Sequence, residues 1–85
     1  MRDLTLMMPE CSPVVVSEAQ ARALASELWD SPLAPGAATA AAHIAVGLRA
    51  ESVAGRRIAF SQREAAAVMR VADNDLRHTL RPTTT

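Results

Sequence analysis

RRIAFSQREAAAVM, residues 56–69, carries the clearest structural signal in the chain. Ile58 and Phe60 alternate with other residues, as is typical of a short β-strand. Ser61 follows, and Glu64 comes three residues later. This is the spacing of a capping box, in which each side chain accepts a hydrogen bond from the other residue's backbone N–H. We therefore predict a strand over 57–60 and a helix that begins at residue 62.

The same order of residue types occurs earlier, in PVVVSEAQARAL, residues 13–24. A β-branched run over 14–16 precedes Ser17, and Gln20 completes a second capping box. We predict a helix from there to about residue 30. The two short strands are expected to pair with each other as a ribbon. The likeness of the two stretches fits either an internal repeat or the common composition of strand-to-helix junctions.

A third helix is predicted over the alanine-dense residues 37–51, where apolar positions recur at helical spacing. The expected fold class is therefore mainly α, with three to four short helices and a two-stranded β ribbon of residues 14–16 with 57–60. Residues 1–13 contain two prolines and no periodicity, and we predict a flexible N-terminal arm there. Residues 14–81 are expected to form one small helical domain, and residues 82–85 a disordered tail.

The apolar content predicts a thin hydrophobic core. Of the 42 apolar residues, 18 are alanine, so much of the apolar content buries little area per residue. A domain of this size is marginally stable alone, which favours a homo-oligomer or a protein partner. Trp29 is expected either to anchor such an interface or to cap the core. The full set of residues expected at a partner interface is Trp29, Leu4, Leu6, Met7 and Met8.

Charge and cysteine content narrow the classes of protein further. No apolar run has the length needed to span a bilayer, and the first residues do not resemble a signal peptide, so we expect a cytoplasmic protein without membrane contact. One cysteine cannot form an internal disulfide, which agrees with a reducing compartment. The formal net charge is zero, which argues against strong non-specific nucleic-acid binding. Residues 51–85 nevertheless hold six arginines against four acids, so any anion-binding surface is expected there.

SQREAAAVMRVADNDLRHTL, residues 61–80, resembles the helix-turn-helix of small bacterial regulators and excisionase-like proteins. In that resemblance Ala65 and Ala66 match the small residues of the first helix, and Val71 matches the buried turn residue. Asp73 matches the N-cap of the second helix. Leu76 and Leu80 match the apolar residues on the side of that helix that faces the core. The resemblance implies insertion of the second helix into the DNA major groove. The residues expected to contact DNA are Arg63, Arg70, Asn74, Arg77, His78 and Arg81.

A single uninterrupted helix over residues 62–81 also accounts for this stretch. Its apolar side chains form one stripe, and Arg63, Arg70, Arg77 and Arg81 lie on the opposite side. In that model the arginines either contact successive phosphates of a nucleic acid or form a face exposed to solvent. Val71 distinguishes the two models, because it is buried in a helix-turn-helix and substantially exposed on a straight helix.

No motif in the sequence predicts an enzyme or a cofactor. His43, His78 and Cys11 lack the spacing of metal ligands, and no phosphate-binding or nucleophile motif occurs. Two functions are therefore expected. The first is a dimeric helix-turn-helix-like transcriptional regulator that binds double-stranded DNA. The alternative is a non-enzymatic helical module that binds another protein, such as a small subunit, an adaptor, an antitoxin-like protein or a phage-encoded partner.

Overall fold

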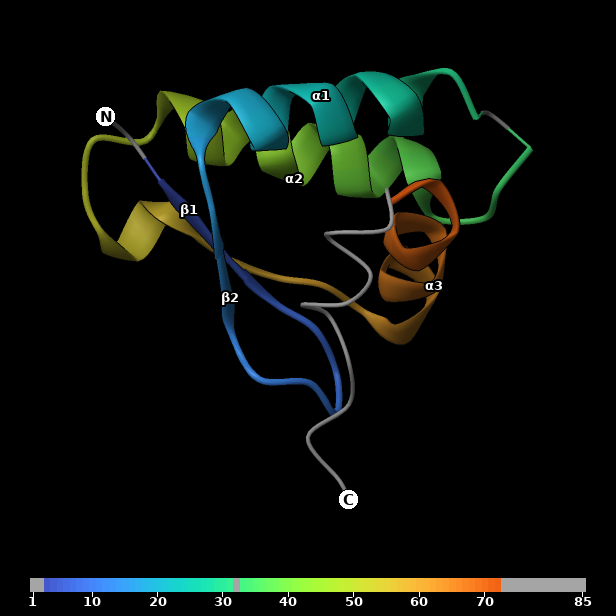
Figure 1. Cartoon of the computed structure of the whole chain (residues 1–85), viewed down its shortest axis with the longest axis horizontal. Coiled ribbons are helices and arrows are strands. Elements are labelled where there is room, and N and C mark those ends of the chain that lie inside the picture. Colours follow the sequence, from blue (N-terminus) through green and yellow to red (C-terminus); the bar gives the residue numbers. More distant parts are fainter. Residues whose placement is uncertain (1–2, 32, 73–85) are drawn as a thin grey trace.

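The computed structural model of the chain describes residues 3–31 and 33–72. In chain order the elements are β1 (Leu4–Met7), β2 (Val14–Val16), α1 (Glu18–Trp29), α2 (Ala37–Arg49), the 3-10 helix η1 (Ala54–Arg56), β3 (Arg57–Ala59) and α3 (Gln62–Val71). Figure 1 shows α1 and α2 lying over the strands, with α3 beneath one end of this helix pair. Within the described ranges, no helix has the length and apolar character needed to cross a membrane.

The strands form a three-stranded mixed sheet in the order β2-β1-β3. β2 runs antiparallel to β1, and β3 runs parallel to it. Leu6, in the central strand, lies opposite Val14 on one side and Ile58 on the other, and all three side chains are buried. This row of three side chains joins segments that are far apart in the sequence into one apolar layer.

The expected fold class was wrong in one important respect. The protein has an α+β fold, because residues 14–16 and 57–59 do not pair with each other and β1 lies between them. Residues 4–7 are therefore the centre of the sheet and not part of a flexible arm. The physical reason is that Leu4 and Leu6, two residues apart, both face the core, where each is fully buried.

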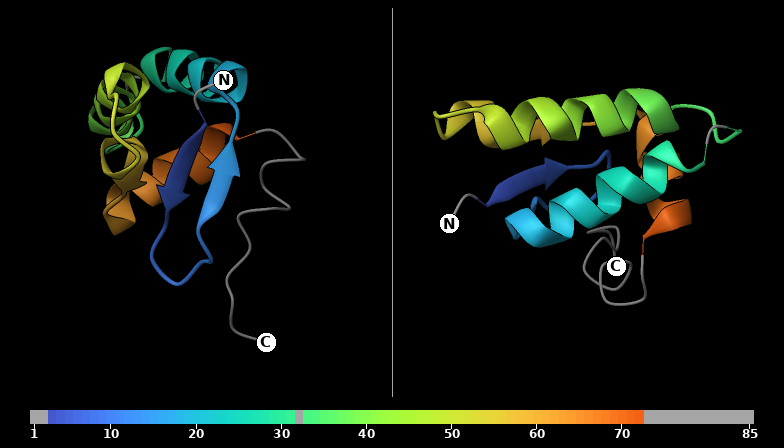
Figure 2. Two further views of the ribbon diagram at one scale, coloured as in Figure 1. Left: turned by 90° about the vertical axis from the view of Figure 1, so that its left-hand side faces the viewer. Right: turned by 90° about the horizontal axis from the view of Figure 1, so that it is seen from above.

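Among the residues that the structure describes, helices cover one face of the sheet and leave the other open (Figure 2). α1 and α2 pack against each other over the buried face, as Figure 2 shows from two directions. On the opposite face, Val15 is 64% exposed and Arg57 is exposed, each beside Thr5 of β1. The buried side chains of this core come from all three α-helices and all three strands of the described residues; the larger ones are Leu4, Leu6, Met8, Val14, Val16, Leu24, Leu28, Ile44, Ile58, Phe60 and Val68.

Both predicted capping boxes are present. Ser17 Oγ accepts from the Gln20 N–H at 3.1 Å, and Gln20 Oε1 accepts from the Ser17 N–H at 2.9 Å. Ser61 and Glu64 repeat the arrangement at 3.2 and 3.0 Å. These bonds satisfy backbone N–H groups that the first turn of a helix leaves unpaired, so α1 and α3 begin where local sequence chemistry places them.

Two glycines allow α2 to approach its neighbours closely. Gly36, the N-cap of α2, has a φ of 83°, in the left-handed region that glycine adopts without steric cost. A Cβ atom there would lie 3.0 Å from the backbone of Arg63 in α3. Gly47 faces β3, where a Cβ would lie 2.7 Å from Ile58 Cδ1. The two positions hold α2 against both the sheet and the start of α3.

Candidate functional site

A groove separates α3 from the chain that connects α1 to α2. It has a volume of about 460 Å³. Its α3 wall is made by residues three or four positions apart, which share one face of a helix. Its other wall is Ala34 and Pro35 from the connection. The complete lining is Ala34, Pro35, Gln62, Arg63, Ala66, Ala67 and Arg70.

Two exposed apolar side chains lie in the same part of the chain. Trp29, the last residue of α1, is 60% exposed, and Leu33, directly before the groove residue Ala34, is 96% exposed. Single exposed apolar residues are common on protein surfaces. Here they occur together with a groove and two arginines. We call this region the end surface, defined as Trp29, Leu33 and the residues that line the groove.

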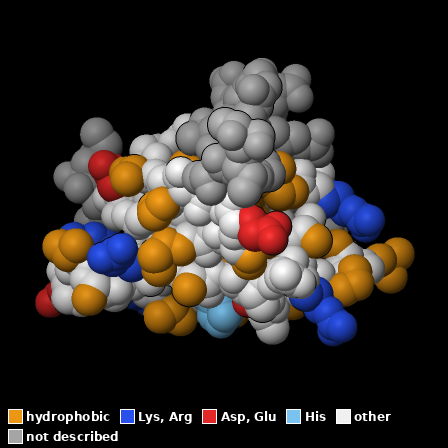
Figure 3. Space-filling model, turned by 90° about the horizontal axis from the view of Figure 1, so that it is seen from below, with side chains coloured by type: hydrophobic (Ala, Val, Ile, Leu, Met, Phe, Trp, Pro, Cys, Tyr) orange, Lys and Arg blue, Asp and Glu red, His pale blue; other side chains and the backbone are white. Residues whose placement is uncertain are grey.

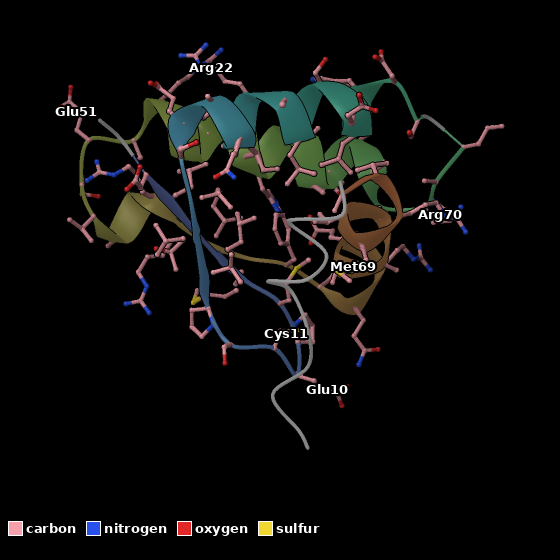
Figure 4. All side chains as sticks on the ribbon, in the orientation of Figure 1. Glu10, Cys11, Arg22, Glu51, Met69 and Arg70 are labelled. Carbon is pink, nitrogen blue, oxygen red and sulfur yellow. The ribbon has the colours of Figure 1, made fainter. Side chains whose placement is uncertain are left out.

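Arginine side chains border the groove and are not gathered into one basic stripe. Arg63 and Arg70 are exposed on α3, and Figure 4 shows Arg70 at the end of the molecule formed by the α1–α2 connection. Figure 3, which views the molecule from below, shows basic side chains at both ends of this face, with hydrophobic, acidic, histidine and uncharged atoms between them. On this face, the described arginines therefore do not form a continuous track for a phosphate backbone.

Only two of the six residues expected to bind DNA lie within the part of the chain that the structure describes. Arg63 and Arg70 lie on one side of α3 and line the same groove. Asn74, Arg77, His78 and Arg81 lie outside the described residues. The structure therefore brings together Arg63 and Arg70. DNA contact by these two residues and by the other four members of the set stays a prediction.

The end of α3 discriminates between the two models for residues 61–81. α3 ends at Val71, and Ala72 is extended, with φ −63° and ψ 141°. One uninterrupted helix over 62–81 was therefore wrong. Val71, which the resemblance matches to the turn, is instead the last residue of α3; it is half-buried and packs against the core. Within α3, however, the buried alanine is Ala67, whereas Ala66 is exposed.

The residues expected at a partner interface separate into two groups. Leu4, Leu6 and Met8 are buried in the core, so they are not available to a partner. Met7 is half-exposed on the open face of the sheet. Trp29 is exposed, which places it at the surface and not as a cap over the core.

A buried carboxylate was missed by the sequence analysis. Glu64 is only 7% exposed, and its Oε1 completes the α3 capping box. Its Oε2 lies 2.8 Å from His43 Nδ1 on α2. Among the described residues no hydrogen bond reaches Oε2, so this close contact with the imidazole is what compensates its burial. The signal available in the sequence was Glu64 itself, which the capping box already placed at the start of a packed helix.

The chemistry of this pair is that of a structural contact. An imidazole held by a carboxylate occurs in catalytic and metal sites, where further ligands or a nucleophile stand beside it. Within residues 3–31 and 33–72, no group of three or more His, Cys, Asp or Glu side chains is placed to hold a metal ion. The His43 side chain is half-exposed and ties α2 to the first turn of α3, which also forms one wall of the groove.

Comparisons with known proteins do not assign the chain to a family. No family model, no curated protein and no solved structure matches it.

Proposed function

We propose that the protein is a non-enzymatic module that binds another protein, or a second copy of itself, through the end surface. The observation that carries this proposal is the 96% exposure of Leu33, which immediately precedes the groove residue Ala34 in the chain. Tryptophan and arginine contribute most often to the binding energy of protein interfaces, whereas leucine and valine are under-represented there. Trp29, Arg63 and Arg70 belong to the end surface, while the other large exposed apolar residues in the described part of the chain are Val15, Val46 and Val53.

The thin core supports the same proposal. Many of the buried residues are alanine, each of which contributes little apolar area. A partner that covers Trp29 and Leu33 would add buried apolar surface that the chain does not supply alone. Binding to the folded state would also raise the apparent stability in proportion to the logarithm of partner concentration.

Replacement of Leu33 with aspartate should abolish this binding without unfolding the protein. We expect a partner captured by the wild-type chain to be lost by Leu33→Asp and weakened by Trp29→Ala, because a buried charge or a lost anchor opposes binding. The change in unfolding free energy should stay within about 0.5 kcal/mol, because Leu33 is a surface residue. Affinity capture with quantitative mass spectrometry, together with sedimentation velocity for self-association, measures both outcomes.

The matched control is Val53→Asp, which also places a carboxylate at an exposed apolar position, outside the end surface. It should retain the partner. Equal capture or equal self-association by wild type and by Leu33→Asp would contradict the assignment of the interface.

A second candidate is a DNA-binding regulator. The observation that favours it is the end of α3 at Val71, because Ala72 is extended and the stretch matched to the helix-turn-helix is therefore not one uninterrupted helix. In this candidate Arg63 and Arg70 neutralise phosphates, and the dimer expected from the sequence matches a palindromic site.

Fluorescence anisotropy with duplex DNA across a salt series tests this candidate. Phosphate contacts make the logarithm of affinity fall linearly with the logarithm of salt concentration. Once a specific site is known, Arg77→Ala should weaken binding to it by about 1–3 kcal/mol if Arg77 contacts a guanine. An absence of binding at low salt would remove the candidate.

A further inference from the structure

Another groove lies between α1 and the end of α3. It has a volume of about 540 Å³. Its α1 wall includes Ala19, Ala23 and Leu24, and its other wall is Val71 and Ala72. Leu24 and Ala72 are buried, whereas the two alanines of α1 are exposed. These small side chains lie one helical turn apart, so larger apolar side chains of another segment can approach α1 closely there.

The chain itself leads into this groove. Ala72, the last residue that the structure describes, is one of the lining residues, and its backbone is extended. Thirteen further residues, 73–85, follow it in the sequence and lie outside the described residues. A segment that is covalently attached beside a binding site is present there at a high effective concentration. Any separate partner must therefore compete with residues 73–85 for the groove.

The sequence that follows Ala72 has the pattern of a short amphipathic helix. Asp73 is a residue type preferred at a helix N-cap. Leu76 and Leu80 are four positions apart, so they share one face of a helix. Pro82 disfavours helical backbone at the residue before it. The pattern is thus that of a helix of about two turns with two leucines on one side.

The dimensions of this pattern agree with those of the groove. A helix over residues 74–81 is about 12 Å long, at 1.5 Å per residue. The α1 wall extends from Ala19 to Glu27, which is also about 12 Å along the helix axis. Leu76 and Leu80 are separated by one turn, as Ala19 and Ala23 are, so each leucine can pack beside one alanine.

We propose that residues 73–81 cover this groove as a further α-helix packed on α1, with Leu76 and Leu80 inserted between α1 and the end of α3. The leucines supply apolar side chains where α1 presents only small ones. Helical spacing then places Asn74 and His78 on the opposite face, in contact with solvent. The inference goes beyond the proposed function, because the docked segment does not involve the end surface.

Hydrogen exchange of the full-length protein, followed by two-dimensional NMR, tests the inference. An isolated helix of eight residues is not stable in water, so slow exchange of the backbone N–H groups of residues 77–81 reports docking. We expect these groups to exchange at least about tenfold more slowly than in an unstructured chain. Nuclear Overhauser effects should also connect methyl groups of Leu76 or Leu80 with the methyl group of Ala23. Exchange at the rates of an unstructured chain would overturn the inference.

A charged side chain in the groove should displace the segment. Ala23→Glu places a carboxylate where the leucines are expected to pack, and burial of an unpaired charge is unfavourable. The protection of residues 77–81 should be lost. The matched control is Ala42→Glu, the same substitution at an exposed alanine of α2 outside the groove, and it should keep the protection.

Substitutions in the segment provide the reciprocal test. Leu76→Asp/Leu80→Asp should abolish the protection, whereas Asn74→Asp/His78→Asp, which adds two carboxylates on the face expected to be solvated, should retain it. Circular dichroism and thermal melting establish that each variant keeps the folded domain. Protection that survives both Ala23→Glu and Leu76→Asp/Leu80→Asp would overturn the inference.

The remaining outcomes identify other occupants of the groove. Protection that falls on dilution would assign the groove to the C-terminal segment of a second copy and overturn docking within one chain. Protection that appears only when a separate protein is added would overturn it as well. Binding through the end surface is measured with Leu33→Asp, so its failure and the failure of this inference are distinguishable.

Discussion

Replacement of Leu6 with alanine is expected to lower the free energy of unfolding by about 2–5 kcal/mol. Leu6 has no exposed surface and lies in the central strand, opposite Val14 and Ile58. The substitution removes buried apolar atoms and leaves a cavity between the sheet and the helices that cover it. For a small domain this is a large part of the total stability, so a considerable fraction of the molecules should unfold near physiological temperature.

Chemical denaturation followed by far-ultraviolet circular dichroism measures this loss. The matched control is Leu33→Ala, the same substitution at a residue that is 96% exposed, and its effect should lie within about 0.5 kcal/mol. A flexible arm over residues 1–13 would make both substitutions harmless. Equal stabilities of the two variants would therefore contradict β1 as the centre of the sheet.

Replacement of His43 with alanine is expected to lower the free energy of unfolding by about 1–3 kcal/mol. The substitution removes the imidazole that lies 2.8 Å from Glu64 Oε2, and no hydrogen bond from another described residue compensates that buried oxygen. A buried carboxylate oxygen without a polar contact is strongly destabilising. The contact between α2 and the start of α3 should weaken with it.

A double-mutant cycle with Glu64→Gln isolates this contact. Glutamine at the third helical position still completes a capping box, so the variant removes the negative charge and keeps the N-terminal cap. In the Glu64→Gln background, His43→Ala should cost at least about 0.5 kcal/mol less than in the wild type. Val46→Ala, at an exposed site on the same helix, should have little effect. Purely additive effects would show that the close contact contributes nothing to stability.

The local elements were largely predictable from the sequence. Both capping boxes, the strands that precede them and the starts of α1 and α3 follow from residues within a few positions of each other. The position of β1 was not predictable in the same way. Leu4 and Leu6 are two positions apart, as residues on one face of a strand are. The apolar segment is short, however, and two prolines follow it, so it was interpreted as an arm. Only the pairing of Leu6 with Val14 and Ile58 shows that it is a strand.

The candidate site was predictable only in fragments. Arg63, Arg70 and Trp29 were identified as candidate contact residues, but for different functions and on different surfaces. The groove forms because α3 packs beside the connection between α1 and α2, a contact between segments about thirty residues apart. No periodicity within either segment indicates the other. The His43–Glu64 contact was missed for the same reason, since each residue has an ordinary role in its own helix.

By itself, then, the sequence determined where helices begin and that residues 14–16 and 57–60 are extended, because hydrogen bonds at a helix cap and alternation along a strand act over a few residues. Only the tertiary structure decided that β1 separates β2 from β3, that Leu4, Leu6 and Met8 belong to the core, and that Ala34, Pro35 and two arginines line one groove. These features depend on burial of apolar surface between distant segments. That burial is non-directional, so the packing of the whole chain selects the pairs that meet.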